Sequence, residues 1–174
     1  MILIFVASLN ENMKLVNNIK NKLNEQNLDS KIINLVNLEL PMYDTLKEQN
    51  DGIPQVALDL AKQMQESQSY IFVSPEYNYG VPPVLVNTIA WISRIDDDFR
   101  KLFSMKKIQL ATHSGSNGQD VLNALRSQFT RLGAIVMPRE IIATYQKTCN
   151  EDSLERILNQ FETFIKESTI KKPN

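Results

Sequence analysis

The chain has 174 residues, of which 43% are hydrophobic and 22% are charged, and its formal net charge at pH 7 is −1. This length predicts one domain with one core, and the balance of hydrophobic and charged residues excludes long disordered stretches. The near-zero net charge argues against a nucleic-acid partner and against the strongly acidic surface expected of a dedicated electron carrier.

The amino-terminal segment predicts a buried strand rather than a signal or a membrane span. Residues 1–8, MILIFVAS, are apolar, but no basic leader precedes them and they fall well short of the roughly 20 residues that a membrane span needs. Cys149 is the only cysteine and cannot form a disulfide within the chain, so we expect a cytoplasmic protein with no membrane partner. Its neighbours include no activating histidine, which predicts an inert thiol.

Short apolar runs alternate with helix-length segments along the chain. Five runs rich in β-branched residues are typical of buried parallel strands, at residues 2–7, 31–36, 70–73, 108–112 and 134–137. Apolar side chains on one stripe or all round predict helices over residues 12–26, 55–65, 83–93, 120–131 and 153–167. The long connection over residues 37–53 is expected to be irregular, with a turn at Asp51–Gly52.

Strands that alternate with helices predict a doubly wound α/β fold, with a five-stranded parallel sheet and helices on both faces. We expect a single domain over residues 1–174. Ligands of such sheets bind beyond the carboxyl ends of the strands, where the strand order reverses. Three loops leave such ends: a first loop (residues 8–12), a second loop (residues 75–81) and a third loop (residues 114–118).

The first loop, SLNEN, enters a predicted helix whose free N–H groups and dipole favour an anion. Ser8, Asn10 and Asn12 could add hydrogen bonds to a phosphate. The alternative is that Asn10 or Asn12 simply caps the helix. The chain contains neither GxGxxG nor GxxxxGK[ST], so the dinucleotide fingerprint and the P-loop are both excluded.

The second loop lies within SPEYNYGVPP, residues 74–83, and is stiff by composition. Gly80 is expected to take the positive φ that the tyrosines resist, and Pro82 or Pro83 suits the first turn of the next helix. Such a loop could clamp a flat heteroaromatic ligand, or it could be a structural crossover only.

The third loop lies within THSGSNGQD, residues 112–120, and offers small residues that let backbone amides approach a planar ligand. A plain helix entry explains it about equally well. His113, the only histidine, has neither a nucleophile motif nor a second metal ligand in view. We therefore expect a hydrogen-bonded histidine at a strand end, with no metal and no catalytic role.

Residues 74–94, SPEYNYGVPPVLVNTIAWISR, resemble the signature segment of the NADPH-dependent FMN reductases, the flavodoxin-like quinone, azo-dye and chromate reductases. LPMYD at residues 40–44 and SGSNG at residues 114–118 are similar to further stretches of that family, so the resemblance reaches residue 142. It implies the strand order 2-1-3-4-5 and FMN as cofactor. The implied cofactor contacts are Ser8, Asn10, Asn12, Pro75, Glu76, Tyr77, Asn78, Tyr79, Ser114, Gly115 and Ser116.

The resemblance also implies an activity, in which NADPH or NADH gives hydride to the flavin and a quinone, azo, metal-oxyanion or free-flavin acceptor takes the electrons. The cofactor carries this chemistry, so no catalytic side chain is expected. The alternative to an enzyme is a non-catalytic flavin-binding or flavin-free interaction module.

The apolar helix over residues 83–93 and the resemblance together predict a homodimer or a dimer of dimers.

The first loop is shorter than that of the family, lacks its arginine and carries Glu11. Like charge near the phosphate predicts weak retention of FMN.

Overall fold

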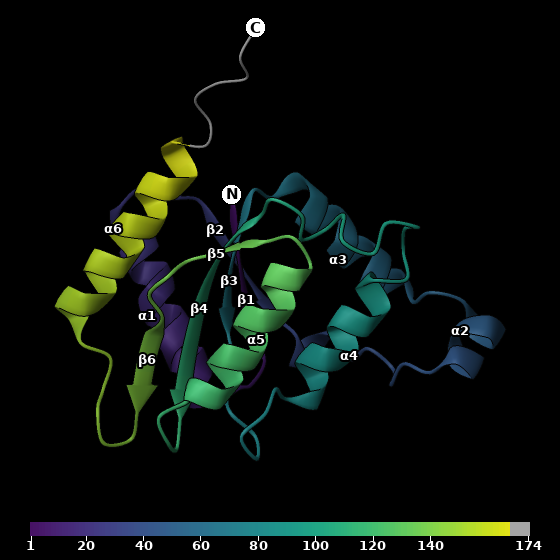
Figure 1. Cartoon of the computed structure of the whole chain (residues 1–174), viewed down its shortest axis with the longest axis horizontal. Helices are drawn as coiled ribbons and strands as arrows, with labels where there is room; N and C mark the ends of the chain where they lie inside the picture. The colour runs from purple at the N-terminus through teal and green to yellow at the C-terminus, as the bar shows by residue number, and fades with distance from the viewer. Residues whose placement is uncertain (168–174) are drawn as a thin grey trace, which may run out of the picture.

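A computed structural model describes residues 1–167, so the last seven residues of the predicted domain, 168–174, lie outside the described part (Figure 1). Its parallel sheet has the order β2-β1-β3-β4-β5, which confirms the order 2-1-3-4-5. The strands are β1 (Ile2–Val6), β2 (Ser30–Asn34), β3 (Ser69–Val73), β4 (Lys107–Ser114), β5 (Ile135–Val136) and β6 (Ile141–Thr144).

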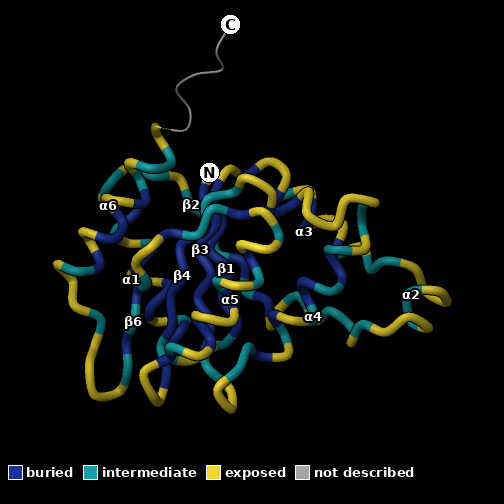
Figure 2. The backbone as a smooth tube through the Cα atoms, viewed as in Figure 1, coloured by how far each residue is buried: buried dark blue, intermediate teal, exposed yellow. Residues whose placement is uncertain are grey.

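Helices cover both faces of the sheet (Figure 1). One face packs on α1 (Glu11–Glu25) and α6 (Glu151–Glu167), and the other on α3 (Gln55–Glu66), α4 (Pro83–Ile92) and α5 (Gln119–Arg131). Side chains of a strand alternate between faces, which is why β1 sends Ile4 to one core and Phe5 to the other. The Phe5 ring stacks on Phe72, with centroids 4.5 Å apart. The central strands β1, β3 and β4 are accordingly the most continuously buried part of the described chain (Figure 2).

The fifth predicted strand, residues 134–137, is found as the two-residue β5, and a further strand that was not predicted, β6, lies on the same side of β4. β5 pairs with the first residues of β4, and β6 pairs with the last four. Pro138 lies between β5 and β6 and has no N–H for the ladder. The buried Gln109 side chain donates to the Arg139 carbonyl at 2.7 Å, so this backbone bonds to a side chain instead of to a strand.

The connection after β2 is more ordered than the sequence predicted. It contains a short 3₁₀ turn (Val36–Leu38) and the helix α2 (Thr45–Asp51). The Asp44 carboxylate accepts a hydrogen bond from the Lys47 N–H at 2.8 Å, and Gly52 ends the helix at φ 73°. The expectation of an irregular segment was therefore wrong, and the Asp51–Gly52 signal marks a helix end.

This connection is fastened to α4, although α2 itself extends away from the sheet (Figure 1). The Asn87 side chain accepts from the Tyr43 N–H at 2.7 Å and donates to the Pro41 carbonyl at 3.0 Å. The Trp91 indole N–H donates to the same carbonyl at 2.7 Å. One side of α4 is thus covered by the connection.

Candidate functional site

The three loops meet at the carboxyl edge of the sheet, at the lower side of Figure 1. β1 and β3 are neighbours, but the helices that follow them, α1 and α4, lie on opposite faces, so the strand order reverses there. A cleft of about 420 Å³ opens at this point between the first and second loops. Its lining includes Ser8, Asn10 and Tyr77, which the sequence predicted, and Val36, Pro82 and Val84, which it did not. These three residues could have been predicted from the sequence, because the end of β2 and the start of α4 lie at the same edge of the sheet as the first and second loops.

The first turn of α1 presents unused hydrogen-bond donors beside this cleft. Asn10 is the N-cap residue, is exposed, and makes no capping bond with its side chain. Within the described chain, the backbone N–H groups of Asn10, Glu11 and Asn12 have no backbone partner. Free N–H groups at the positive end of a 15-residue helix form a site suited to an anion.

Asn12 has a different role from the one predicted. Its buried side chain accepts from the His113 N–H at 2.8 Å and donates to the His113 carbonyl at 2.9 Å. It therefore ties α1 to the end of β4, and its amide group is not free to bind a phosphate or to cap the helix. His113 is held through its backbone, and its ring packs edge-on against Tyr145 with centroids 4.8 Å apart.

Glu11 does not face the cleft. Its carboxylate lies 2.6 Å from the Lys14 ammonium, and the pair lines a separate cavity of about 180 Å³ together with His113. The hydrogen bond from Lys14 lowers the pKa of the Glu11 carboxyl. Its negative charge is compensated locally, so the structure removes the main reason for expecting Glu11 to repel a phosphate.

The second loop forms a tight turn that projects two tyrosines. Tyr77 and Gly80 exchange backbone hydrogen bonds of 3.1 and 2.9 Å, and the residues between them, Asn78 and Tyr79, have φ values of 49° and 60°. Positive φ at both central positions is typical of a type I′ turn. The prediction that Gly80 takes the positive φ was wrong, since Tyr79 takes it instead. The turn leaves Tyr77 51% exposed and Tyr79 75% exposed.

The base of the second loop is held by the neighbouring strand. The buried Thr112 hydroxyl donates to the Ser74 carbonyl at 2.7 Å. Pro75 is buried, so it supports the loop from beneath more than it offers a surface.

Glu76 joins the second loop to the third. Its carboxylate accepts hydrogen bonds from the Ser116 hydroxyl, from the Ser114 hydroxyl at 3.3 Å and from the Val121 N–H at 3.2 Å. Burial alone would raise the pKa of Glu76, but the hydrogen bonds outweigh it and lower that pKa. The structure thus brings Glu76, Ser114 and Ser116 together, and their side chains form hydrogen bonds with one another. Gly115 stands in open space.

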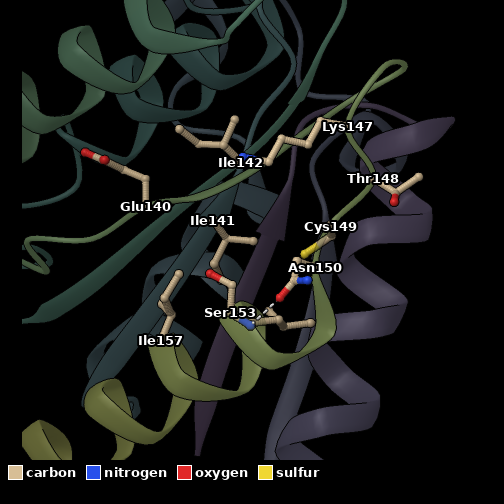
Figure 3. A pocket seen from close by; sticks show the side chains of 10 residues that line it. Glu140, Ile141, Ile142, Lys147, Thr148, Cys149, Asn150, Ser153 and Ile157 are labelled. Atoms are coloured by element: carbon tan, nitrogen blue, oxygen red, sulfur yellow. Dashed lines mark hydrogen bonds between the residues drawn. The ribbon is translucent and has the colours of Figure 1, made fainter.

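Two further cavities flank the turn between β6 and α6. One, of about 560 Å³, lies against the third loop and is lined in part by Ser116, Thr144 and Lys147. The other, of about 440 Å³, has Ile141 and Ile157 in its wall and Cys149 at its side (Figure 3). Burial raises the pKa of the Cys149 thiol, which keeps it protonated and agrees with the expected inert role.

Residues 1–167 contain no cluster of three His, Cys, Asp or Glu side chains able to hold a metal ion. The same residues form no helix of the length and apolarity that crossing a bilayer requires.

A parallel sheet of order 2-1-3-4-5 with a cleft at its β1/β3 switch point defines the flavodoxin-like class of α/β proteins. Solved structures support this class. FerB, a flavoenzyme NAD(P)H:(acceptor) oxidoreductase from Paracoccus denitrificans, superposes with a TM-score of 0.72 at 18% identity, over 95% of this chain and 94% of that one. A flavodoxin from the domain Archaea gives 0.67 at 14% identity, over 95% and 99%.

Within that class, the chain belongs to the NADPH-dependent FMN reductase family, whose sequence model matches residues 1–148. A quinone reductase of Escherichia coli (strain K12) is 41% identical over 59 residues, which cover 34% of this chain and only 31% of that relative. An uncharacterized protein of Mycoplasma pneumoniae, the MG342 homolog, is 29% identical over 143 residues, which cover 75% of this chain and 85% of the relative. The expected family is thereby confirmed.

Proposed function

We propose that the chain is an NAD(P)H-dependent oxidoreductase that carries FMN and reduces a small-molecule acceptor. The observation that carries this proposal is the cleft at the switch point, which has the open N-terminus of α1 on one side and the tyrosine turn on the other. Family membership supports FMN and NADPH as the two redox partners.

Quinones are the first candidate acceptors, because the E. coli relative is named a quinone reductase. Azo compounds are a second candidate, since an azoreductase from Bacillus anthracis shares the fold with a TM-score of 0.62 at 18% identity. Metal oxyanions and free flavin complete the set to be tested.

The residues present fit FMN. The backbone N–H groups of Asn10, Glu11 and Asn12 would hold its phosphate, with the Ser8 hydroxyl and the Asn10 side chain as additional donors. The ring would lie against the exposed turn of Tyr77, Asn78 and Tyr79 and against Gly115.

When bound, FMN supplies the hydride and electron chemistry of the reaction. The chain's own part is to orient it. The hydrogen bonds across the Tyr77–Gly80 turn and from Thr112 hold the second loop rigid. The N–H groups of Asn78 and Tyr79, which have no backbone partner in the described chain, could donate to negative charge that develops on the ligand. No side chain in the cleft has to move a proton.

A homodimer remains part of the proposal. The connection before α2 covers Asn87 and Trp91, so that side of α4 is buried within the chain and is not available to a partner. Val86 stays 48% exposed, and Met42 and Leu46 on the covering segment are 71% and 69% exposed. These apolar side chains suit an interface between two copies.

The proposal is tested on the purified chain. We expect yellow protein, or colourless protein that binds added FMN, and NADPH oxidation that depends on FMN and on a quinone. Replacement of the quinone by an azo dye or a metal oxyanion ranks the acceptors. Failure to bind FMN, or bound FMN without NADPH oxidation, would favour the alternative of a non-catalytic module.

A further inference from the structure

Two helix N-termini, those of α1 and α5, lie at the candidate site, and the structure treats them differently. The N–H groups at the start of α1 are open, as described above. At the start of α5, the N–H groups are already occupied: Glu76 accepts from the Val121 N–H at 3.2 Å, and the Asn117 side chain accepts from the Gln119 N–H at 3.1 Å. Glu76 belongs to the second loop and is 45 positions away in sequence.

α5 cannot provide this cap from its own N-cap position. That position is Gly118, which has φ 68° and no side chain to accept a hydrogen bond. A Cβ atom there would lie 2.5 Å from the Thr112 Cγ2 atom, so the serine, threonine or aspartate usual at an N-cap cannot fit. Val121 is the third residue of α5, the position whose N–H an N-cap side chain normally satisfies. Glu76 thus replaces the missing cap from outside the helix.

The same carboxylate also fixes the distance between two loops. One of its oxygens accepts from both Ser114 and Ser116, and the other accepts from Val121. Its partners are hydroxyl and amide groups, not cations, so its negative charge is balanced by dipoles, including that of α5. A second anion near the start of α5 would be repelled by the charge of Glu76 and would find the N–H groups already occupied.

We propose that Glu76 is a positioning residue that clamps the second loop to the third and closes the N-terminus of α5, so that the phosphate of a bound flavin is directed to α1. Its side chain is then a built-in anion and not a ligand contact. The clamp sets the distance between the second and third loops, between which the flavin ring would bind. The occupied N–H groups of α5 exclude the phosphate from that helix end. The identity of the ligand rests on the proposed function, but the exclusion of a phosphate from α5 does not.

Inorganic phosphate is the probe that separates the two helix ends. In the wild-type chain, titration should shift the backbone amide NMR signals of Asn10, Glu11 and Asn12 and leave those of residues 118–121 unchanged. In Glu76→Ala, we expect the signals of residues 118–121 to shift as well. Equal shifts at both helices in the wild type, or no new shifts in the variant, would overturn the exclusion. Absent shifts at α1 in the wild type would instead count against the proposed phosphate site.

Lumiflavin, which has the ring but no phosphate, tests the clamp. We expect Glu76→Ala to bind it about tenfold more weakly, equivalent to roughly 1.4 kcal/mol. Asp44→Ala is a matched control, because it removes the capping carboxylate of α2, which extends away from the sheet (Figure 1). That variant should lose stability without changing lumiflavin affinity. If both variants weaken lumiflavin equally, the effect is general loosening and the clamp is overturned.

Glu76→Gln keeps one carbonyl acceptor and removes the charge, so it serves if Glu76→Ala does not fold. Because the folded-state pKa of Glu76 is lowered, the clamp is present above the ordinary carboxyl value of 4.5 and is lost as the pH falls through the lower folded value. The groups that contact the Glu76 carboxylate are the hydroxyls of Ser114 and Ser116 and backbone N–H groups in the first turn of α5. That turn also carries Asp120. Among the described residues, no side chain forms an ion pair with Glu76. Wild-type lumiflavin affinity should fall in that acid range and the Gln variant's should not; identical profiles would overturn the charged clamp.

Discussion

Replacement of Asn12 by alanine tests the bridge that ties the first turn of α1 to β4. The change removes hydrogen bonds of 2.8 and 2.9 Å and leaves the N–H and the carbonyl of His113 without their partner. A buried group that loses its partner costs about 1–3 kcal/mol, and since His113 is only half-buried we expect a total loss of roughly 2–4 kcal/mol. Each 1 kcal/mol lowers the Tm of a domain of this size by about 2–4 °C, so calorimetry should show a decrease of roughly 4–16 °C.

Asn10→Ala is the matched control, two positions away and of the same residue type. Asn10 is exposed and makes no capping bond, so its loss should change stability by less than about 0.5 kcal/mol. If Asn10 binds the phosphate, that variant should weaken FMN about tenfold, or roughly 1.4 kcal/mol, and leave riboflavin affinity unchanged. Asn12→Ala should weaken both ligands, because it displaces the helix start. Equal Tm values for the two variants would refute the assigned bridge.

Gly118→Ala should lower the free energy of unfolding in urea by about 1–3 kcal/mol or more, through positive φ and the clash with Thr112, whereas Gly115→Ala, in open space, should not. Tyr79→Val should be less stable than Tyr79→Gly by about 1–2 kcal/mol, because a β-branched residue resists φ 60°; equal stability would contradict the turn. Sedimentation should find a wild-type dimer that Val86→Glu dissociates, and a monomeric wild type would end the dimer proposal.

The sequence predicted the layers of this fold because periodic burial determines them. The strand order, supplied by the family resemblance, and all five predicted helices are found, and no helix end is displaced by more than two residues. α2 was missed although its signals were present, since Asp44 and Gly52 stand at the two ends of TLKEQND. The long spacing between strands favoured an irregular segment, but a seven-residue helix with both caps fits within it.

Site residues were harder to predict, because side chains that suit a ligand also suit their own neighbours. Asn12 and Glu76 were expected to contact FMN, yet each makes hydrogen bonds to a distant backbone group, on His113 and Val121 respectively. No local pattern reveals such pairing, which depends on where β4 and α5 lie in three dimensions. The prediction of a positive φ at Gly80 was wrong for a related reason. The hydrogen bonds between Tyr77 and Gly80 make Asn78 and Tyr79 the central residues of the turn, and these positions require positive φ whatever residue occupies them.

The break between β5 and β6 also affects how readily copies of this chain associate through the edge of the sheet. An exposed sheet edge is a template on which a strand of another molecule can add, and the risk grows with the length of straight, unpaired backbone. Here that edge offers two residues in β5 and four in β6, separated by Pro138 and by a carbonyl already bonded to Gln109. An incoming strand finds no continuous ladder to extend. We therefore expect the break between β5 and β6 to disfavour edge-to-edge aggregation of the folded chain.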